Sequence, residues 1–168
     1  MSAQANPKQA LRPFLPADTP LLTEIFRASI EELTSDDYSA AQQDAWIASA
    51  NDGEAFAERL ARQLTLVGTI AGSVVGFISL ADSKEIDMLF VHPAAARRGV
   101  ASTLCDAIEK LAAARGAKAL TVDASDTARP FFERRGFVAQ QRNSFALGGE
   151  WVANTTMQKK LAANGDKS

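Results

Sequence analysis

The chain contains the stretch LFVHPAAARRGVAS at residues 89–102, and this stretch decides which fold we expect. Its first three residues are apolar and suit a strand, which Pro93 ends because proline lacks the N–H that a ladder needs. A loop of small residues follows. Apolar side chains then recur at helical spacing from Arg98 to Ala114. The stretch therefore predicts a strand, a short loop and a long helix, in that order.

The junction between this loop and this helix has the chemistry of an anion site. The first amides of a helix have no partner within it, and the helix dipole makes this end positive. Gly99 and Ala101 leave the backbone accessible, Ser102 adds a hydroxyl, and Arg97 and Arg98 add charge. These features predict a pyrophosphate cradle. An ordinary helix N-terminus with two surface arginines explains the same residues. Neither a Walker loop nor a dinucleotide fingerprint is present.

Segments on both sides of this stretch predict an α/β domain. We expect helices over about residues 18–33, 39–50, 56–60, 98–114 and 127–135, and strands over 11–14, 64–70, 74–80, 85–91, 119–122, 137–139, 143–147 and 151–161. Strands separated by single helices favour a mixed sheet with helices on both faces. We expect one domain over residues 10–161, and flexible tails at residues 1–9 and 162–168.

A second block, ASDTARPFFERRGF at residues 124–137, follows the first after the expected strand. Together the two blocks resemble the GNAT-type N-acetyltransferases. In that family a strand ending Val-x-Pro precedes Gln/Arg-x-x-Gly-x-Gly/Ala, as Val91-x-Pro93 precedes residues 96–101 here. The family's Asn-x-x-Ala-x-x-x-Tyr-Glu-x-x-Gly-Phe is similar to residues 125–137. The element order matches over about residues 10–161, and a bacterial branch with an early Tyr-x-x-x-Gln…Trp, here Tyr38, Gln42 and Trp46, is most similar.

The resemblance implies a central mixed sheet of about seven strands and a cofactor cleft between the strand ending at Val91 and the strand ending at Asp123. It implies acetyl-CoA as the co-substrate, with no metal. The residues that it assigns to acetyl-CoA are Leu89, Phe90 and Val91 for the pantetheine arm, Arg97, Arg98, Gly99, Val100, Ala101 and Ser102 for the pyrophosphate, and Ser125 in the place of the family's Asn.

Two positions depart from the family pattern. Ala96 stands where the motif has Gln or Arg, so one side-chain contact to the cofactor is missing, although most of the cradle is backbone. Phe132 stands where many relatives have the Tyr that is credited with protonating the CoA thiolate. Phenylalanine has no proton to give. Either another group supplies the proton or the thiolate leaves unassisted, which a thiol pKa of about 8.5 makes feasible.

An ammonium nucleophile needs a base. Glu85 lies on the strand that the resemblance places beside the thioester, and Asp87 lies two residues on. The two carboxylates would be neighbours, so like-charge repulsion could raise the pKa of one of them. A solvent-facing pair after a turn is the alternative explanation. Asp123 is a further candidate beside the same cleft, and Tyr38 lies where relatives bind the acceptor.

The charges suggest the class of acceptor. Residues 18–58 hold ten carboxylates and one base, whereas residues 97–160 hold eleven bases and six acids. A negative approach surface would attract a cationic amine, and the alternative is that these helix faces are simply solvated. We expect transfer of the acetyl group to a primary amine by direct attack, with a small-molecule or peptide amine as acceptor. The competing hypothesis is a non-catalytic CoA-binding or interaction module of the same fold.

Composition excludes several other classes. The 168 residues include one Cys and one His, which rules out a disulfide framework and a His-rich or multi-Cys metal site. The longest apolar runs fall short of the ~20 residues of a membrane span. A net charge of −2 gives no general case for nucleic acid. The polar N-terminus lacks a secretory core. We expect a cytoplasmic protein without nucleic-acid or membrane partners, and the resemblance allows a homodimer.

Overall fold

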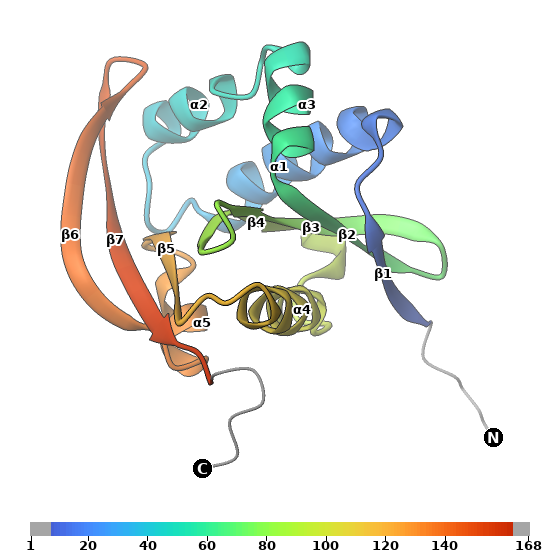
Figure 1. Ribbon diagram of the computed structural model, residues 1–168. Coiled ribbons are helices and arrows are strands. Elements are labelled where there is room, and N and C mark those ends of the chain that lie inside the picture. Colours follow the sequence, from blue (N-terminus) through green and yellow to red (C-terminus); the bar gives the residue numbers. More distant parts are fainter. Residues whose placement is uncertain (1–7, 163–168) are drawn as a thin grey trace.

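Seven strands pair into one mixed sheet in the computed structural model, which describes residues 8–162 (Figure 1). Their order across the sheet is β1-β2-β3-β4-β5-β7-β6. The strands are β1 Gln9–Pro13, β2 Leu64–Ile70, β3 Ser73–Ala81, β4 Glu85–Val91, β5 Ala119–Ser125, β6 Val138–Leu147 and β7 Glu150–Lys160. Within this sheet β4 and β5 are parallel, and all other neighbours are antiparallel. The predicted mixed sheet is confirmed.

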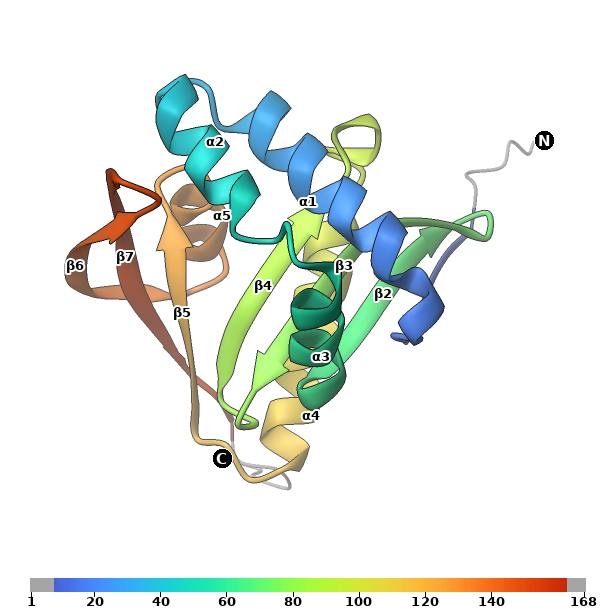
Figure 2. The ribbon, with the colours of Figure 1, turned by 90° about the horizontal axis from the view of Figure 1, so that it is seen from above.

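Five α-helices cover the two faces of the sheet (Figures 1 and 2). They are α1 Thr19–Leu33, α2 Ala40–Ala48 and α3 Gly53–Arg62 on one face, and α4 Val100–Ala114 and α5 Arg129–Arg134 on the other. Short 3-10 turns at Pro16–Asp18 and Pro93–Ala95 precede α1 and α4. Ser39 begins α2 through a capping box with Gln42, as the sequence predicts for Ser39.

Each face of the sheet buries its own apolar cluster. On the α4 side, Leu104 and Ile108 pack with Ile78, Leu80 and Leu120 of the sheet. On the α1 side, Leu22, Phe26 and Phe56 pack with Phe77 and Met88. The two clusters hold the sheet between helices, and so they fix the positions of β4 and of the N-terminus of α4.

Two glycines let α4 approach the sheet closely. Gly68 and Gly76 face each other across the β2–β3 ladder, and Val100 at the start of α4 lies over both. A Cβ atom at Gly76 would lie 3.0 Å from the Phe90 carbonyl oxygen and 3.2 Å from Cγ1 of Val100. A Cβ atom at Gly68 would lie 3.3 Å from Cγ1 of Val100. The absence of both side chains therefore places the first turn of α4 beside the end of β4.

The ladder between β4 and β5 stops after two residue pairs, Glu85 with Thr121 and Ile86 with Val122. β4 also carries a bulge there, because Leu80 of β3 pairs with Ile86 while Ser79 pairs with Met88. Asp87 is the additional residue. Beyond this bulge the two strands diverge, so the predicted cleft between the strand ending at Val91 and β5 is present.

Several predicted boundaries are wrong by a few residues. α4 begins at Val100 and not at Arg98, because Arg97 and Gly99 have left-handed backbones. α5 covers Arg129–Arg134 and not 127–135, and β6 is one strand interrupted by a register shift and not two. β1 begins at Gln9, inside the predicted tail, and the Gln9 side chain donates to the Arg98 carbonyl at 2.7 Å. Residues 1–7 and 163–168 of the predicted tails lie outside the described residues.

We predict that Gly76→Ala lowers the free energy of unfolding by about 1–3 kcal/mol, since the new methyl group must displace the Phe90 carbonyl or Val100. Gly53→Ala is the matched control. Gly53 is the first residue of α3, and a Cβ atom there meets nothing within 4 Å. Urea unfolding should show no loss for the control, and equal losses in the two variants would contradict this account of the packing.

Candidate active site

Two pockets open on the two sides of the diverging end of β4. The first, here called the α4 pocket, is lined by Leu89–Val91, the loop and first turn of α4, and residues of α1 and α5. The second, the splay pocket, is lined by the side of β4 that faces β5, by β5 itself, and by residues of α2, α3 and the β6–β7 hairpin. Both are lined by Trp46, Leu89, Phe90, Ser125 and Ala128, so the two pockets meet at these residues.

The loop before α4 presents its backbone to the α4 pocket. Arg97 and Gly99 have φ values of +64° and +81°. The helical ladder begins where the Thr103 N–H donates to the Gly99 carbonyl at 3.0 Å, so the amides of residues 100–102 have no partner within the helix. A Cβ atom at Gly99 would meet nothing within 4 Å, which leaves space for a ligand above these amides. The arrangement suits an anion such as a pyrophosphate.

Most of the predicted cradle lines this pocket. Arg97, Gly99, Val100, Ala101 and Ser102 do so, and Arg98 does not. The Arg98 carbonyl instead accepts from Gln9, which ties β1 to the loop. Arg98 is exposed, so its side chain contributes positive charge near the cradle without lining it.

β4 turns backbone groups toward the gap. The N–H of His92, just after β4, donates to Val75 of β3 at 2.8 Å. Backbone groups alternate in direction along a strand, so the N–H and C=O groups of Val91 and Leu89 point away from β3. They face the opening between β4 and β5, where the ladder has ended. An extended ligand arm with amide groups can therefore pair with β4 in place of a strand.

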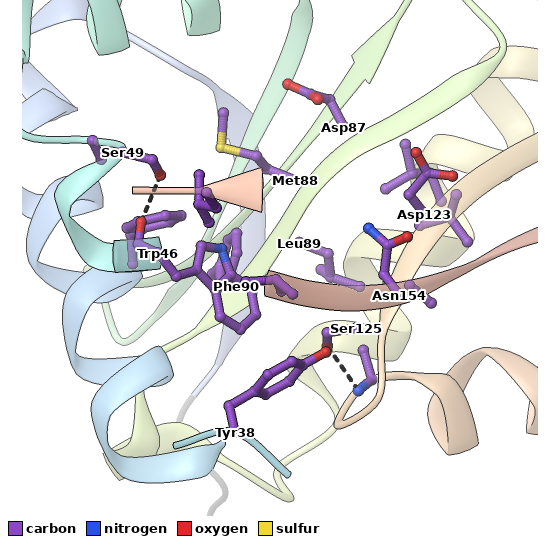
Figure 3. Close-up of a pocket in the computed structure, with 18 of the residues that line it drawn as sticks. Tyr38, Trp46, Ser49, Asp87, Met88, Leu89, Phe90, Asp123, Ser125 and Asn154 are labelled. Carbon is purple, nitrogen blue, oxygen red and sulfur yellow. Dashed lines mark hydrogen bonds between the residues drawn. The ribbon is translucent and has the colours of Figure 1, made fainter. Parts of the chain in front are cut away.

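The splay pocket has an aromatic wall and a polar wall (Figure 3). Trp46 of α2 and Phe90 of β4 form one side, their rings 6.2 Å apart and tilted by 65°. Asp123 of β5 and Asn154 of β7 face them from the other side, with Leu89 between. An organic molecule with one polar end fits such a pocket better than a fully charged one does.

Asp87 lies in this pocket but its charge is already satisfied. Its two carboxylate oxygens accept from Arg59 of α3 at 2.7 and 2.8 Å, and Gln63 donates at 2.9 Å. Burial opposes ionisation of Asp87, yet the hydrogen bonds from Arg59 and Gln63 outweigh it and lower the pKa. A carboxylate held in this way is a weak base. The geometry favours Asp87 as a group that fixes the bulge of β4.

Among residues 8–162, neither Glu85 nor Asp123 forms an ion pair like that of Asp87 with Arg59. Burial raises the pKa of Glu85, and the charges of Asp123, Asp87 and Asp82 raise it further. Glu85 does not line either pocket, whereas Asp123 lines the splay pocket. Oδ1 of Asp123 accepts from the Thr156 hydroxyl at 2.6 Å. Among residues 8–162, its other oxygen has no hydrogen-bond partner and remains available to a ligand.

Tyr38 is buried, and its hydroxyl is used twice. It donates to the Ala153 carbonyl of β7 at 2.9 Å and accepts from the Asp126 amide at 2.8 Å. Burial raises the pKa of Tyr38. Nearby, Gln42 donates to the Trp151 carbonyl at 2.7 Å. These contacts join the α1–α2 connection to the β6–β7 hairpin, so Tyr38 closes the splay pocket without offering its hydroxyl to a ligand.

Ser125 and Phe132 stand at the junction of the pockets. The Ser125 hydroxyl accepts from the Ala128 amide at 3.1 Å, which leaves its own hydrogen free to be donated, and Ser125 lines both pockets. Phe132 is 2% exposed and lines the splay pocket. Its ring is packed against Phe131 and Phe137. The position of the family's Tyr is therefore a buried ring with no polar atom.

Sequence reasoning did not assign Asn154 or Arg59 to the site, and it assigned Phe90 to the pantetheine arm and not to the wall of the splay pocket. Asn154 reaches the pocket because it pairs with Ser125 across the β5–β7 ladder, a register that the sequence does not specify. Arg59 comes from a helix 28 residues before Asp87. Alternation along residues 88–91 indicates which of these side chains share a face of the strand. The bulge at Asp87 shifts that alternation relative to the residues before it, so the sequence alone does not show which face Phe90 takes.

Several carboxylates of the acidic segment 18–58 are paired with cations. Asp18 is buried and forms two hydrogen bonds with Arg12. Glu24 and Glu31 both pair with Arg27. The predicted negative approach surface is therefore weaker than the count of carboxylates suggests, and the negative charge at the splay pocket comes from β4 and β5.

The described part of the chain holds neither a metal-binding cluster nor a membrane-spanning helix. Within residues 8–162, no set of three or more His, Cys, Asp or Glu side chains is placed to hold a metal ion. None of the helices formed by these residues has the length and apolar character needed to cross a bilayer.

Comparisons with known proteins agree with this geometry. A family model described as an acetyltransferase (GNAT) domain matches residues 34–161. YafP of Escherichia coli K12, an uncharacterized N-acetyltransferase, is 39% identical over 150 residues, which are 89% of this chain and 95% of YafP. A GCN5-related N-acetyltransferase from Rhodopseudomonas palustris has a crystal structure that matches with a TM-score of 0.90 and 55% identity, over 95% of this chain and all of that chain.

PaiA N-acetyltransferase from Thermoplasma acidophilum was solved in complex with coenzyme A. It matches with a TM-score of 0.76 over 91% of this chain and 99% of its own. At 20% identity this likeness concerns the fold alone.

We predict that Arg59→Gln lowers the free energy of unfolding at pH 7 by about 1 kcal/mol, a small value because Arg59 is partly exposed. The lowered pKa of Asp87 stabilises the fold above the pKa of the unfolded carboxyl, and this contribution is lost as the pH falls through the folded pKa. The difference between wild type and variant should therefore shrink in acid. Arg62→Gln, in the same helix, is the control, since Arg62 forms no ion pair within residues 8–162. Urea unfolding at several pH values tests this, and a difference that persists at the lowest pH would contradict it.

Proposed function

Since the chain belongs to the GNAT family of acetyltransferases, we propose that it transfers the acetyl group of acetyl-CoA to a primary amine by direct attack. The observation that carries the proposal is the meeting of the two pockets at Leu89 and Ser125. One pocket ends in an anion cradle, and the other contains Asp123, one oxygen of which has no hydrogen-bond partner among residues 8–162. We further propose that residues 10–161 act as one catalytic domain.

The α4 pocket fits coenzyme A. The amides of residues 100–102 and the hydroxyl of Ser102 would hold the pyrophosphate, and Arg97 and Arg98 would add positive charge. The backbone groups of Leu89 and Val91 would pair with the amides of the pantetheine arm in the gap beside β4. Ala96 lacks the Gln or Arg side chain of the family motif. This arrangement tolerates that difference because the cradle consists mainly of backbone N–H groups.

The acetyl group would then lie where the pockets meet. There a backbone N–H at the end of β4 can donate to the thioester oxygen, and the same hydrogen bond strengthens when attack makes that oxygen negative. Both substrates approach this point from opposite pockets, so the protein supplies orientation by holding each in its own cavity.

The amine must lose a proton before it attacks. Asp123 has a free oxygen in the splay pocket and would bind the ammonium group. Glu85 does not line the pocket, but it lies near enough to Asp123 for that charge to raise its pKa. Glu85 would therefore accept the proton, through a water molecule. Asp87, held by Arg59, would keep β4 in position and would not take the proton.

Departure of CoA cannot use Phe132. A thiolate is a good leaving group because the pKa of a thiol is about 8.5, so the reaction does not require a strong acid. The free hydrogen of the Ser125 hydroxyl lies at the junction of the pockets and can donate to the sulfur as negative charge develops. Transfer without the family's Tyr is therefore chemically reasonable.

We predict that Gly99→Trp weakens acetyl-CoA binding at least tenfold, because the indole would occupy the space above the amides of α4. Gly116→Trp is the matched control at the other end of the helix. Gly99 and Gly116 both have left-handed backbones and open space at Cβ, so the two variants carry similar backbone strain. Titration calorimetry with acetyl-CoA should separate them. If wild type fails to bind acetyl-CoA at millimolar concentration, the proposed function is wrong.

We predict that Glu85→Gln lowers kcat roughly tenfold to a thousandfold with little change in acetyl-CoA affinity. The wild-type rate should rise with pH through the raised pKa of Glu85, since only the ionised form accepts a proton. The variant should lose this rise. Glu58→Gln removes the same charge from the exposed face of α3 and serves as control. Full activity of Glu85→Gln with a verified acceptor would refute this assignment of the base, and full activity of Asp123→Asn would refute the role of Asp123 in binding the ammonium group.

A further inference from the structure

The aromatic side chains that line the splay pocket indicate the class of acceptor more closely than the charge of the pocket does. Three of the rings in its lining are open to a ligand: Trp46 and Phe90, which are half-buried, and Phe145, which is 38% exposed. The rings of Phe26 and Tyr38 lie behind them, with Phe26 centred 4.8 Å from Phe90 and Tyr38 centred 5.5 Å from Trp46. The rings of Trp46 and Phe90 are therefore backed by other rings, which limits how far they can move aside.

A polar acceptor would not complement the aromatic wall of the splay pocket. The side chains of Trp46 and Phe90 offer a ligand mainly ring faces and edges, which bind apolar groups and single cations. A polyamine chain or a peptide backbone brings several polar groups that must be hydrogen-bonded when they leave water. Of the other polar side chains in the lining, Tyr38, Ser49, Arg59 and Asp87 are already hydrogen-bonded within the protein. Asp123 and Asn154 lie on the opposite wall (Figure 3).

The charges of the pocket provide for one cation. Asp87 is bound by Arg59 and Gln63, so its charge is not available to a ligand. Asp123 retains a free oxygen among the described residues. Arg59 also lines the pocket, and its charge is cancelled by that of Asp87 in the ion pair. A ligand with two or three ammonium groups therefore meets one available carboxylate in the lining and would bury its other charges without a partner.

We infer that the acceptor is a monoamine that carries an aromatic or bulky apolar group a short distance from its nitrogen, an inference that rests on the proposed acetyl transfer. The ammonium group binds Asp123, the apolar group packs against Trp46, Phe90 and Phe145, and the nitrogen reaches the thioester beside Leu89. After Glu85 takes one proton from the ammonium group through a water molecule, the nitrogen forms a bond to the acetyl carbon and the carbon–sulfur bond breaks. The nitrogen loses its second proton to the departing thiolate, and the products are an amide and the CoA thiol.

A panel of amines tests this inference by the thiol that is released from acetyl-CoA. The probes are 2-phenylethylamine, ethylamine, which lacks the ring, and spermidine, which carries three amino groups. We expect kcat/KM for 2-phenylethylamine to exceed that for each of the others at least tenfold, because burial of a phenyl group favours binding by about that factor or more.

A pair of variants on the β6–β7 hairpin separates the pocket from the surface. Phe145 lines the pocket, whereas Trp151 is 70% exposed and lines neither pocket. Trp151 pairs with Ala146, the neighbour of Phe145, so the two rings point to opposite faces of the hairpin. Phe145→Ala should lower the ratio of kcat/KM for 2-phenylethylamine to that for ethylamine several-fold, and Trp151→Ala should leave this ratio unchanged.

The outcomes distinguish the inference from the function on which it rests. If ethylamine or spermidine is used as well as 2-phenylethylamine, or if Phe145→Ala and Trp151→Ala behave alike, the inference is wrong and acetyl transfer stands. If calorimetry shows that acetyl-CoA binds but no amine releases thiol, the proposed transfer is wrong and the inference fails with it.

Discussion

The early end of the β4–β5 ladder is the constraint on which the rest of the site depends. After Ile86 the backbone groups on one side of β4 have no strand to pair with, and buried backbone groups must find another partner. The bulge at Asp87 lies at the point where pairing ends, and Arg59 and Gln63 hold it by three hydrogen bonds. An ion pair 28 residues apart in sequence thus fixes the place where the sheet opens.

Two other features turn this opening into a site with two entrances. Gly68 and Gly76 allow Val100 to lie directly on the sheet, which brings the first amides of α4 beside the end of β4. On the other side of the sheet, Tyr38 and Gln42 join the α1–α2 connection to the β6–β7 hairpin. The first feature forms the cradle and the second forms the wall of the splay pocket. Each uses contacts between segments that are far apart in the chain.

The sequence predicted the parts of the structure that local chemistry determines. The strand–loop–helix of residues 89–114 and the second block at residues 124–137 carry their own signals: an apolar run, small residues, and helical periodicity. The sequence could not predict which charges would be neutralised. Asp87 and Glu85 look equivalent in the sequence, but only Asp87 meets a guanidinium, so the pKa of one falls and that of the other rises. Similarly, Tyr38 has a hydroxyl that looks available until Ala153 and Asp126 occupy it.

The same tertiary pairing changes what the charge of the chain means for substrate choice. The acidic segment 18–58 suggested attraction of cations over a broad surface, yet Arg12 and Arg27 bind three of its carboxylates. Attraction between exposed charges more than about 10 Å apart is largely screened at moderate salt. The remaining attraction of the protein for a cationic acceptor must therefore act at close range. In the splay pocket that contribution comes from Asp123, opposite a wall of rings. Selection of the acceptor is therefore decided inside the pocket, by one carboxylate and the apolar surface facing it, and not by the net charge of the protein.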